Sequence, residues 1–315
     1  MVDYTTNKPT STFQRNRQVQ FYEQTDFRNY GPADPTLFVA GLVSSVTPAL
    51  NVASKETRVV GSRKLYSNRK LMVEGSVEIV YEMLDTKLLK YGILDTGAGS
   101  VEKPIRFVES GLINGLQRYR LYNDCITETV ALALERDFMF TQTFYASDIT
   151  NWIDEAALKT ALGVTGTDTV NWAADPTAEP INHLDHETIP PNSGSPFQIG
   201  ADIFLYNSLN VEVNNNLIKL NPGGYDQTKY IQPGNKVVTG TLNTWLVEGA
   251  VIQDYVRNFT SNTLTLKIKE AGGSDITLTL TGVKFTSNTD TVDTGANELN
   301  TMDLPFTATD LQIAN

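Results

Sequence analysis

The chain has 315 residues, of which 40% are hydrophobic, and a formal net charge of −11. This length can bury a sizeable core and favours two domains, and no stretch approaches the roughly 18 to 20 apolar residues that span a bilayer, so we expect a soluble protein. Residues 151–315 carry 8 basic and 19 acidic side chains, whereas residues 1–150 carry 17 of each. Because affinity for nucleic acid depends on lysine and arginine neutralising phosphates, this balance excludes a protein that grips DNA.

The first 36 residues are expected to form an extended N-terminal arm, since they hold too few clustered apolar residues to pack alone. Its aromatic residues favour an arm that docks on another surface: Phe13, Phe21, Tyr22, Phe27 and Tyr30. No apolar segment follows the charges of the N-terminus, so we expect no secretory signal. The single cysteine, Cys125, excludes an intramolecular disulfide and is typical of a small strand residue, which indicates synthesis in a reducing cytoplasm.

The clearest strand signal is Leu71–Glu82. Its apolar residues alternate with Glu74, Ser76, Glu78 and Glu82, which predicts a strand with one dry face and one wet, acidic face. Before it come a first apolar run, Leu37–Val46, and a charged loop that carries Arg58, Arg63, Lys64, Arg69 and Lys70. This loop could be a nucleic-acid patch, but a solvated hairpin is the favoured interpretation. After it we expect a short helix over Asp85–Ile93 and strands over residues 104–108, 118–122, 126–135 and 138–145.

Residues 150–200 interrupt this pattern. Asn151–Leu162 predicts a short amphipathic helix closed by Gly163, and a linker rich in Pro, Thr, Asn and Gly follows it. His183, Asp185 and His186 in this linker could be imagined as metal ligands. However, the two histidines have no third strong ligand nearby, so we expect no metal site. The chain has no nucleophile, phosphate-binding or metalloprotease motif, so we expect no cofactor and no enzyme.

The second half repeats features of the first. Around Gly240, Val238 and Leu242 take the dry side of a strand, while Thr239, Thr241 and Asn243 take the wet side. Leu-Asn-Val recurs around Asn51 and Asn210, glycine at Gly75 and Gly240, and a Phe-x-Ala-x-Asp pattern at Phe144 and Phe306, each pair being separated by nearly the same length of chain. These landmarks predict an internal duplication of about 160 residues, with chance recurrence as the alternative.

The expected fold is therefore mainly β. It comprises two similar β-sandwich domains, each with a short α-helix (the second over Glu248–Asn258), joined by a partly helical linker and preceded by the arm. The expected boundaries are residues 1–36 for the arm, 37–149 for the first domain, 150–200 for the linker and 201–315 for the second domain.

The strands VEGSVE and VTGTLN, the short helix after each, the hairpin TLTLKI/ITLTLTGVKF and the closing LPFTATD resemble the tail tube proteins of long-tailed bacteriophages and related tailed viruses. The likeness covers most of Thr47–Ile149 and Asn207–Leu311, and its motifs are loose patterns of strand and turn, with no invariant functional residue to match. Subunits of that family form stacked rings whose strands merge into a continuous barrel around a lumen, through which the genome is delivered. Those rings are commonly hexameric with one tube domain per subunit.

The resemblance implies a structural protein of the virion tail, made in the host cytoplasm, with no membrane insertion. A duplicated chain would form trimeric rings with pseudo-sixfold symmetry, stacked into a tube that contacts other tail proteins and lets DNA pass; a hexamer of one elaborated domain is the alternative. The candidates for lining the lumen are Glu74, Glu78, Glu82, Thr239, Thr241 and Asn243, for which an ordinary solvent-facing sheet surface is the competing interpretation. The candidates for contacts between rings are Arg58, Arg63, Lys64, Arg69 and Lys70.

Two other classes of protein stay open at this point. One is a carbohydrate-binding β-sandwich surface protein, in which Trp152, Trp172 and Trp245 would stack on sugar rings. The other is a glycoside hydrolase, which would need two carboxylates facing each other across a cleft at roughly 5 to 10 Å.

Overall fold

The computed structural model describes residues 18–58, 65–95, 97, 99–135, 138–174, 181–183, 197–200, 202–203, 206–220, 228–245, 249–269, 275–287, 289–291 and 301–314. Within these ranges, the side chains of residues 52–73, 182–183, 202–203, 245, 249–253, 269, 275 and 289–291 are not described. The fold is mainly β, in a sandwich-like arrangement, and three short helices accompany the strands in the described part of the chain.

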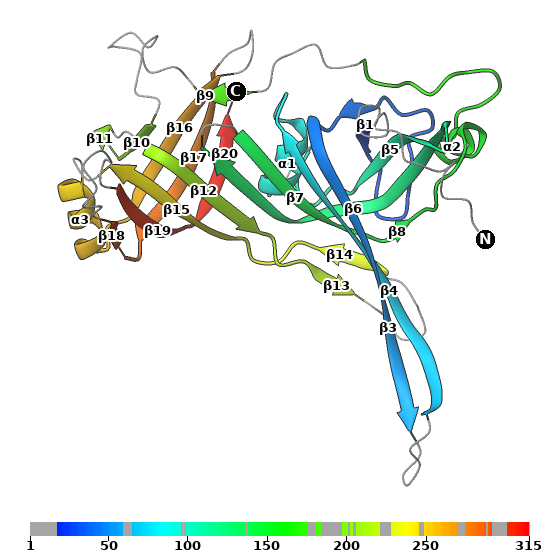
Figure 1. Cartoon of the computed structure of the whole chain (residues 1–315), viewed down its shortest axis with the longest axis horizontal. Coiled ribbons are helices and arrows are strands. Elements are labelled where there is room, and N and C mark those ends of the chain that lie inside the picture. The colour runs from blue at the N-terminus through cyan, green and yellow to red at the C-terminus, as the bar shows by residue number, and fades with distance from the viewer. Residues whose placement is uncertain are drawn as a thin grey trace, which may run out of the picture.

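A long antiparallel sheet runs through the whole molecule (Figure 1). Its strand order is β3–β4–β7–β6–β12–β15–β19, and β17 and β18 share the last edge. The strands are β3 (Leu42–Arg58), β4 (Leu65–Glu82), β7 (Phe138–Ala146), β6 (Leu116–Leu134), β12 (Tyr206–Asn214), β15 (Val237–Trp245), β19 (Thr301–Ala308), β17 (Asp275–Phe285) and β18 (Thr289–Thr291).

Two smaller sheets form where β6 and β17 bend out of the long sheet. Asp124 (φ 51°) and Gly282 (φ 63°) mark the two bends, because a left-handed residue redirects a strand. The first small sheet joins β6 to β2 (Phe38–Val39), β1 (Gln18–Glu23), β5 (Ile105–Ile113) and β8 (Asp148–Ile149). The second joins β17 to β9 (Asn182–His183), β10 (Phe197–Ile199), β11 (Asp202–Ile203), β16 (Asn262–Lys269) and β20 (Asp310–Ala314).

The three expected helices are confirmed, with small shifts at their ends. They are α1 (Lys87–Ile93), α2 (Glu155–Leu162) and α3 (Gly249–Asn258). In α2 the Asp154 side chain caps the first turn by accepting the backbone N–H of Ala157, and Gly163 closes the last turn in the left-handed conformation. These local signals explain why the sequence predicted α2 well.

The core lies between the long sheet and the small sheets. One continuous cluster of buried side chains extends from the first half, at Val77 and Phe144, to the second half, at Val213 and Leu304. A second cluster lies where Leu158 and Leu162 of α2 cover the outer face of the first small sheet. In the described part of the chain, no helix is both long and apolar enough to cross a membrane.

Three stretches differ from the sequence expectation. Gln18–Glu23, expected in the arm, is strand β1, which pairs with β5 and buries Phe21 and Tyr22. The hairpin favoured for the charged stretch is present, but its strands are longer than expected: β3 continues to Arg58 and β4 begins at Leu65, and the two strands leave the body as a long hairpin arm (Figure 1). Residues 118–122 and 126–135, expected as two strands, belong to one bent strand, β6.

Candidate functional site

One face of the long sheet is open to solvent. Along each strand, buried residues such as Val77, Leu132 and Val211 point into the core, so their neighbours must point the other way. We call this outward side the open face; its members are half-buried or exposed and comprise Thr47, Glu74, Ser76, Glu78, Val80, Glu82, Thr129, Ala131, Ala133, Thr141, Thr143, Asn210, Glu212, Thr239, Thr241, Asn243, Asp303, Pro305 and Thr307.

The strand register brings the two halves of the chain together on this face. Glu78 pairs with Thr47 on one side and Thr143 on the other. Further along the sheet, Glu212 pairs with Ala131 and with Thr239. Residues paired directly in an antiparallel sheet share a face. The open face therefore continues without a break from β3 to β19, and an open groove runs along it over β7, β6, β12, β15 and β19.

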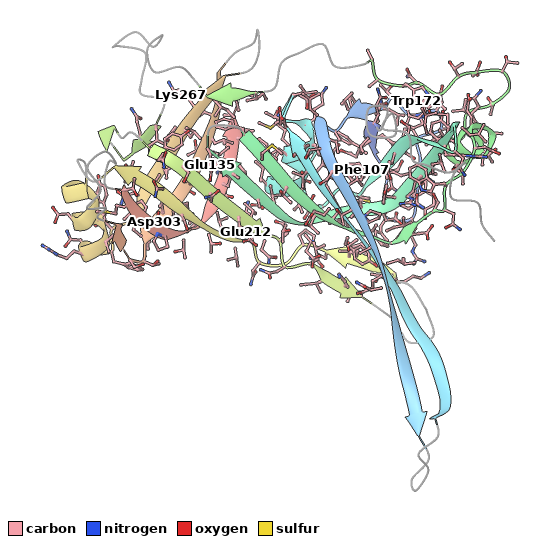
Figure 2. All side chains as sticks on the ribbon, viewed as in Figure 1. Phe107, Glu135, Trp172, Glu212, Lys267 and Asp303 are labelled. Carbon is pink, nitrogen blue, oxygen red and sulfur yellow. The ribbon has the colours of Figure 1, made fainter. Side chains whose placement is uncertain are left out.

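The open face is acidic and otherwise neutral. Its members, as defined above, include five carboxylates and no lysine or arginine. Among the described residues, cations approach it at its two edges. Lys219 Nζ lies 4.0 Å from Glu74 Oε2 beside β4, and Lys284, which pairs with Thr307 from β17, has its Nζ 4.7 Å from the centre of the Phe259 ring. Figure 2 shows Glu212 and Asp303 along the lower side of the body and Lys267 on the upper side. A surface of this composition repels polyanions such as nucleic acid.

The six residues expected to line a lumen all lie on the open face. Glu74, Glu78 and Glu82 are on β4, and Thr239, Thr241 and Asn243 are on β15, with β7, β6 and β12 between the two strands. Sequence reasoning missed Glu212 and Asp303 on the same face. The alternation in NVEVN and MDLPF carried that signal.

The two halves meet along β6 and β12. Residues Leu209–Asn214 pair with residues 129–134, so the long sheet crosses the junction as ordinary antiparallel ladder. Beside it, Asn215 donates through Nδ2 to the carbonyl oxygens of Gly92 (3.0 Å) and Thr127 (3.1 Å). These bonds tie the start of the second half to the end of α1 and to β6.

Lys236 closes the same junction from the neighbouring strand. Its Nζ donates to the Ile93 carbonyl oxygen at 2.9 Å and lies 2.8 Å from Asp95 Oδ1 and 2.5 Å from Asp310 Oδ1. The side chain of Lys236 is largely buried, whereas that of Asp95 is exposed. The ion pair with Asp310 is the less exposed of the two and is less screened by solvent.

A short hairpin covers one end of the open face. Its strands are β13 (Ile218–Leu220) and β14 (Tyr230–Gln232). On its inner side Ile231 packs in a small buried cluster with Val101, Ile126 and Tyr145, and Lys219 lies over the Tyr145 ring. Its outer side leaves Ile218, Leu220 and Tyr230 about half exposed.

The basic residues expected to contact other rings belong to the hairpin arm. Arg58, Arg69 and Lys70 pair with Leu65, Lys55 and Ser54 in the β3–β4 ladder, and their side chains are not described. Arg63 and Lys64 lie outside the described residues. The sequence of the arm, residues 52–73, carries six basic and one acidic side chain.

The two described tryptophans of the carbohydrate-binding alternative are not brought together. Trp172 stacks on Tyr119, with ring centres 5.6 Å apart, and Arg120 lies 4.5 Å from the centre of the Trp152 ring. Tyr119 and Arg120 are consecutive strand residues, so the two tryptophans flank opposite faces and share no platform. The side chain of Trp245 is outside the described part.

No metal or nucleophile site emerges from the residues described. They contain no group of three or more His, Cys, Asp and Glu side chains that could hold a metal, while Asp185, His186 and the His183 side chain lie outside them. Cys125 is buried, and desolvation raises the pKa of its thiol well above the usual value, which opposes reactivity.

No model of a known protein family matches the chain, and no curated protein is similar to it in sequence. Inference about its function depends on three features of the structure: the open face, the junction between the halves and the hairpin arm.

Proposed function

We propose that the chain is the major tail tube subunit of a tailed virus. In this proposal it is a structural virion protein without enzymatic activity, and it polymerises into stacked rings that enclose a channel for DNA. The observation that carries the proposal is the open face, a continuous acidic and neutral wall built from both halves of the chain.

Such a wall suits a DNA channel for an electrostatic reason. Proteins hold DNA by neutralising phosphates with lysine and arginine, and each neutralised phosphate adds to affinity. The open face offers carboxylates and short polar side chains instead. DNA inside the channel would meet no lysine or arginine among these open-face residues and could slide.

We further propose that the two halves are copies of one β-sandwich unit. Support comes from the ladder: Gly75 pairs with Leu50 and Ala146 in the first half, and Val238 pairs with Val213 and Ala308 in the second. The corresponding pairs are Gly75 and Val238, Leu50 and Val213, and Ala146 and Ala308. The two members of each pair are separated by the same length of chain, to within one position. Both halves also use the same strand order, namely β3–β4–β7–β6 and β12–β15–β19 followed by β17 and β18.

The bends of β6 and β17 add independent support. Next to the left-handed residue Asp124, the backbone N–H of Ser147 donates to the Asn123 carbonyl at 2.9 Å. Next to Gly282, the N–H of Thr309 donates to the Thr281 carbonyl at the same distance. The β5–β6 and β16–β17 ladders each change register across these bends. A bend with a register change that occurs at the same place in both halves supports a duplication more strongly than a repeated strand does.

The ladder also changes which sequence landmarks correspond. Phe144 and Phe306 keep matching places, opposite Val77 and Gly240. Gly75 and Gly240 are offset from each other by two positions, and Asn51 and Asn210 by four. In the proposed duplication, the phenylalanine match therefore agrees with the strand pairing, whereas the glycine and asparagine matches are out of register with it.

Ring closure follows from the junction that already exists within the chain. Among the described residues, β3 pairs only with β4 and β18 only with β19, so each end of the long sheet has an open edge. In the proposed ring, β3 of one chain pairs with the β17–β18 edge of the next, as β12 pairs with β6. Three chains then supply six units with pseudo-sixfold symmetry, and no edge stays exposed.

The hairpin arm reaches out of the body and is assigned to contacts between rings and with other tail proteins. The arm has a net charge of +5, so the rest of the chain carries −16. Opposite charges on arm and body favour contact between a basic arm and the acidic body of a neighbouring ring.

The test is negative-stain electron microscopy of the purified protein at high concentration, combined with the mass of any ring. We expect hollow rings or tubes with six lobes and three chains per ring. Six chains per ring would keep the tube function and overturn the duplication, whereas monomers under every condition tested would overturn the tube function.

A further inference from the structure

Two large apolar side chains are exposed at opposite ends of the long sheet. Leu50 on β3 and Phe259, directly after α3, each expose 54% of their surface. Leu50 is on the core side of its strand, in line with Val46, but no layer covers it. Single exposed apolar side chains are common on protein surfaces, so the two are informative only through comparison with buried counterparts.

The junction inside the chain provides that comparison. The counterpart of Leu50 in the ladder is Val213, which is fully buried and pairs with Val130 on β6. Next to Val213, Asn215 and Lys236 contact the end of α1 at the carbonyls of Gly92 and Ile93. The edge of β12 and the end of α1 thus meet at this junction, which we call the internal seam.

The two open edges of the long sheet carry the residues that would form a second contact of this kind between two chains. Other counterparts can be found at the same distance along the chain that separates Leu50 from Val213. In this way Val52 and Val73 correspond to Asn215 and Lys236, and the two valines pair with each other where the arm leaves the body. The counterpart of α1 is α3, and Phe259 follows its last residue, Asn258. The backbone N–H of Phe259 donates to the Val256 carbonyl at 3.2 Å, which holds the ring at the helix end.

We infer that Phe259 anchors the contact between chains, seated against Leu50 and the apolar root of the arm of a second copy. This inference rests on the proposed ring and names the residues that close it. The internal seam is sealed by an amide and an ammonium group, whereas the seam between chains pairs an aromatic ring with Leu50 and two valine positions. Lys284, whose ammonium lies over the Phe259 ring, completes the anchor.

Side chains must supply much of the free energy of this seam. Pro48 on β3 has no backbone N–H, and proline in a strand is tolerated where the donor would face away from the paired neighbour. The outer edge of β3 therefore lacks one ladder hydrogen bond. Aromatic and aliphatic anchors in a desolvated centre dominate such interfaces.

The first test compares Leu50→Ser and Phe259→Ser with Leu116→Ser. Leu116 is 55% exposed at the start of β6, beside the turn that joins β5 to β6 and away from both open edges, so it is a matched control. Mass photometry over a range of protein concentrations measures the association constant of the ring. We expect each seam variant to weaken association about tenfold or more and the control to leave it unchanged, with the same melting temperature of the monomer in all three variants.

The second test locates the contact directly. A single variant Leu50→Cys is mixed with a single variant Phe259→Cys and treated with a short bis-maleimide cross-linker; the buried Cys125 should not react. The expected product is a cross-linked dimer from the mixture and none from either variant alone. Rings of three chains that form without this product, and without a defect in the serine variants, would overturn the seam and leave the tube function intact. If the wild-type chain forms no ring, both the seam and the tube function are overturned.

Discussion

Gly92 lies where α1 packs against the long sheet beside the junction. A Cβ at this position would come within 2.2 Å of Val130 Cγ2 and 2.8 Å of Gln142 Nε2, so a Gly92→Ala side chain must displace buried atoms. We expect this variant to lower the free energy of unfolding by about 1 to 3 kcal/mol, measured by urea denaturation. Gly111→Ala is the control, because its Cβ would meet the Trp152 ring at an ordinary 3.7 Å; equal losses in the two variants would contradict the packing argument.

Tyr81 makes the stability of the protein depend on pH above the usual pKa of tyrosine. Its hydroxyl donates to Gln142 Oε1 at 3.0 Å, and burial raises its pKa above the ordinary value of 10. Above pH 10 the unfolded chain releases this proton while the folded chain retains it, so the free energy of unfolding falls as pH rises. We expect Tyr81→Phe to lose about 1 kcal/mol near neutral pH and to show a shallower decline above pH 10. Urea denaturation across this range measures both effects, and identical declines would refute the assignment.

At the scale of elements, two segments of equal length take different forms. The described parts of residues 52–73 form the arm that leaves the body, whereas residues 215–236, at the corresponding place, contain the β13–β14 hairpin folded over the first half. Ile231 explains the difference, because it enters an apolar cluster with Ile126 and Tyr145. Its counterpart in the arm is Asn68, which offers no such anchor.

The arm can be tested by removing it. Replacing residues 54–71 with a tight two-residue turn keeps the β3–β4 pairing inside the body, so we expect an unchanged melting temperature. In the proposed tube this variant should form rings that do not stack, as seen by electron microscopy. Normal tubes from the shortened chain would exclude the arm, including Arg63, Lys64, Arg69 and Lys70, from contacts between rings.

Local signals let the sequence predict the helices and most strands, whereas long-range pairing set the features it missed. The cap at Asp154 and the terminating Gly163 are readable within one turn of α2. The basic stretch indicated a hairpin but not how far β3 and β4 extend into it, and the buried strand β1 was hidden by its polar flanks. The acidic face was predicted on β4 and β15, but its continuity depends on pairs between β6 and β12, which no local pattern specifies.

At the scale of the whole molecule, the charge of the open face should decide whether DNA is released. We expect assemblies of the wild-type chain to retain no duplex DNA at near-physiological salt. Assemblies of a double variant, Glu78→Lys with Glu212→Lys, should bind DNA with an affinity that falls steeply as salt rises. Electrophoretic mobility measures retention, and Glu102→Lys with Asp168→Lys is the control, since it makes the same change in net charge at exposed sites outside the open face. Equal retention by the two variants would show that total charge, not the wall, governs binding.

Strand β6 serves both halves of the molecule, and this has a consequence for synthesis on the ribosome. Leu134, the last residue of β6, pairs with Leu209, so the whole stretch from Glu135 to Leu209 must be translated before the two partners can meet. At a usual elongation rate this takes about 4 to 15 seconds. During that interval the outer edge of β6 has no partner from its own chain, and two nascent chains can pair through it. The rate of translation over this stretch therefore sets how much newly made protein reaches its correct partner strand.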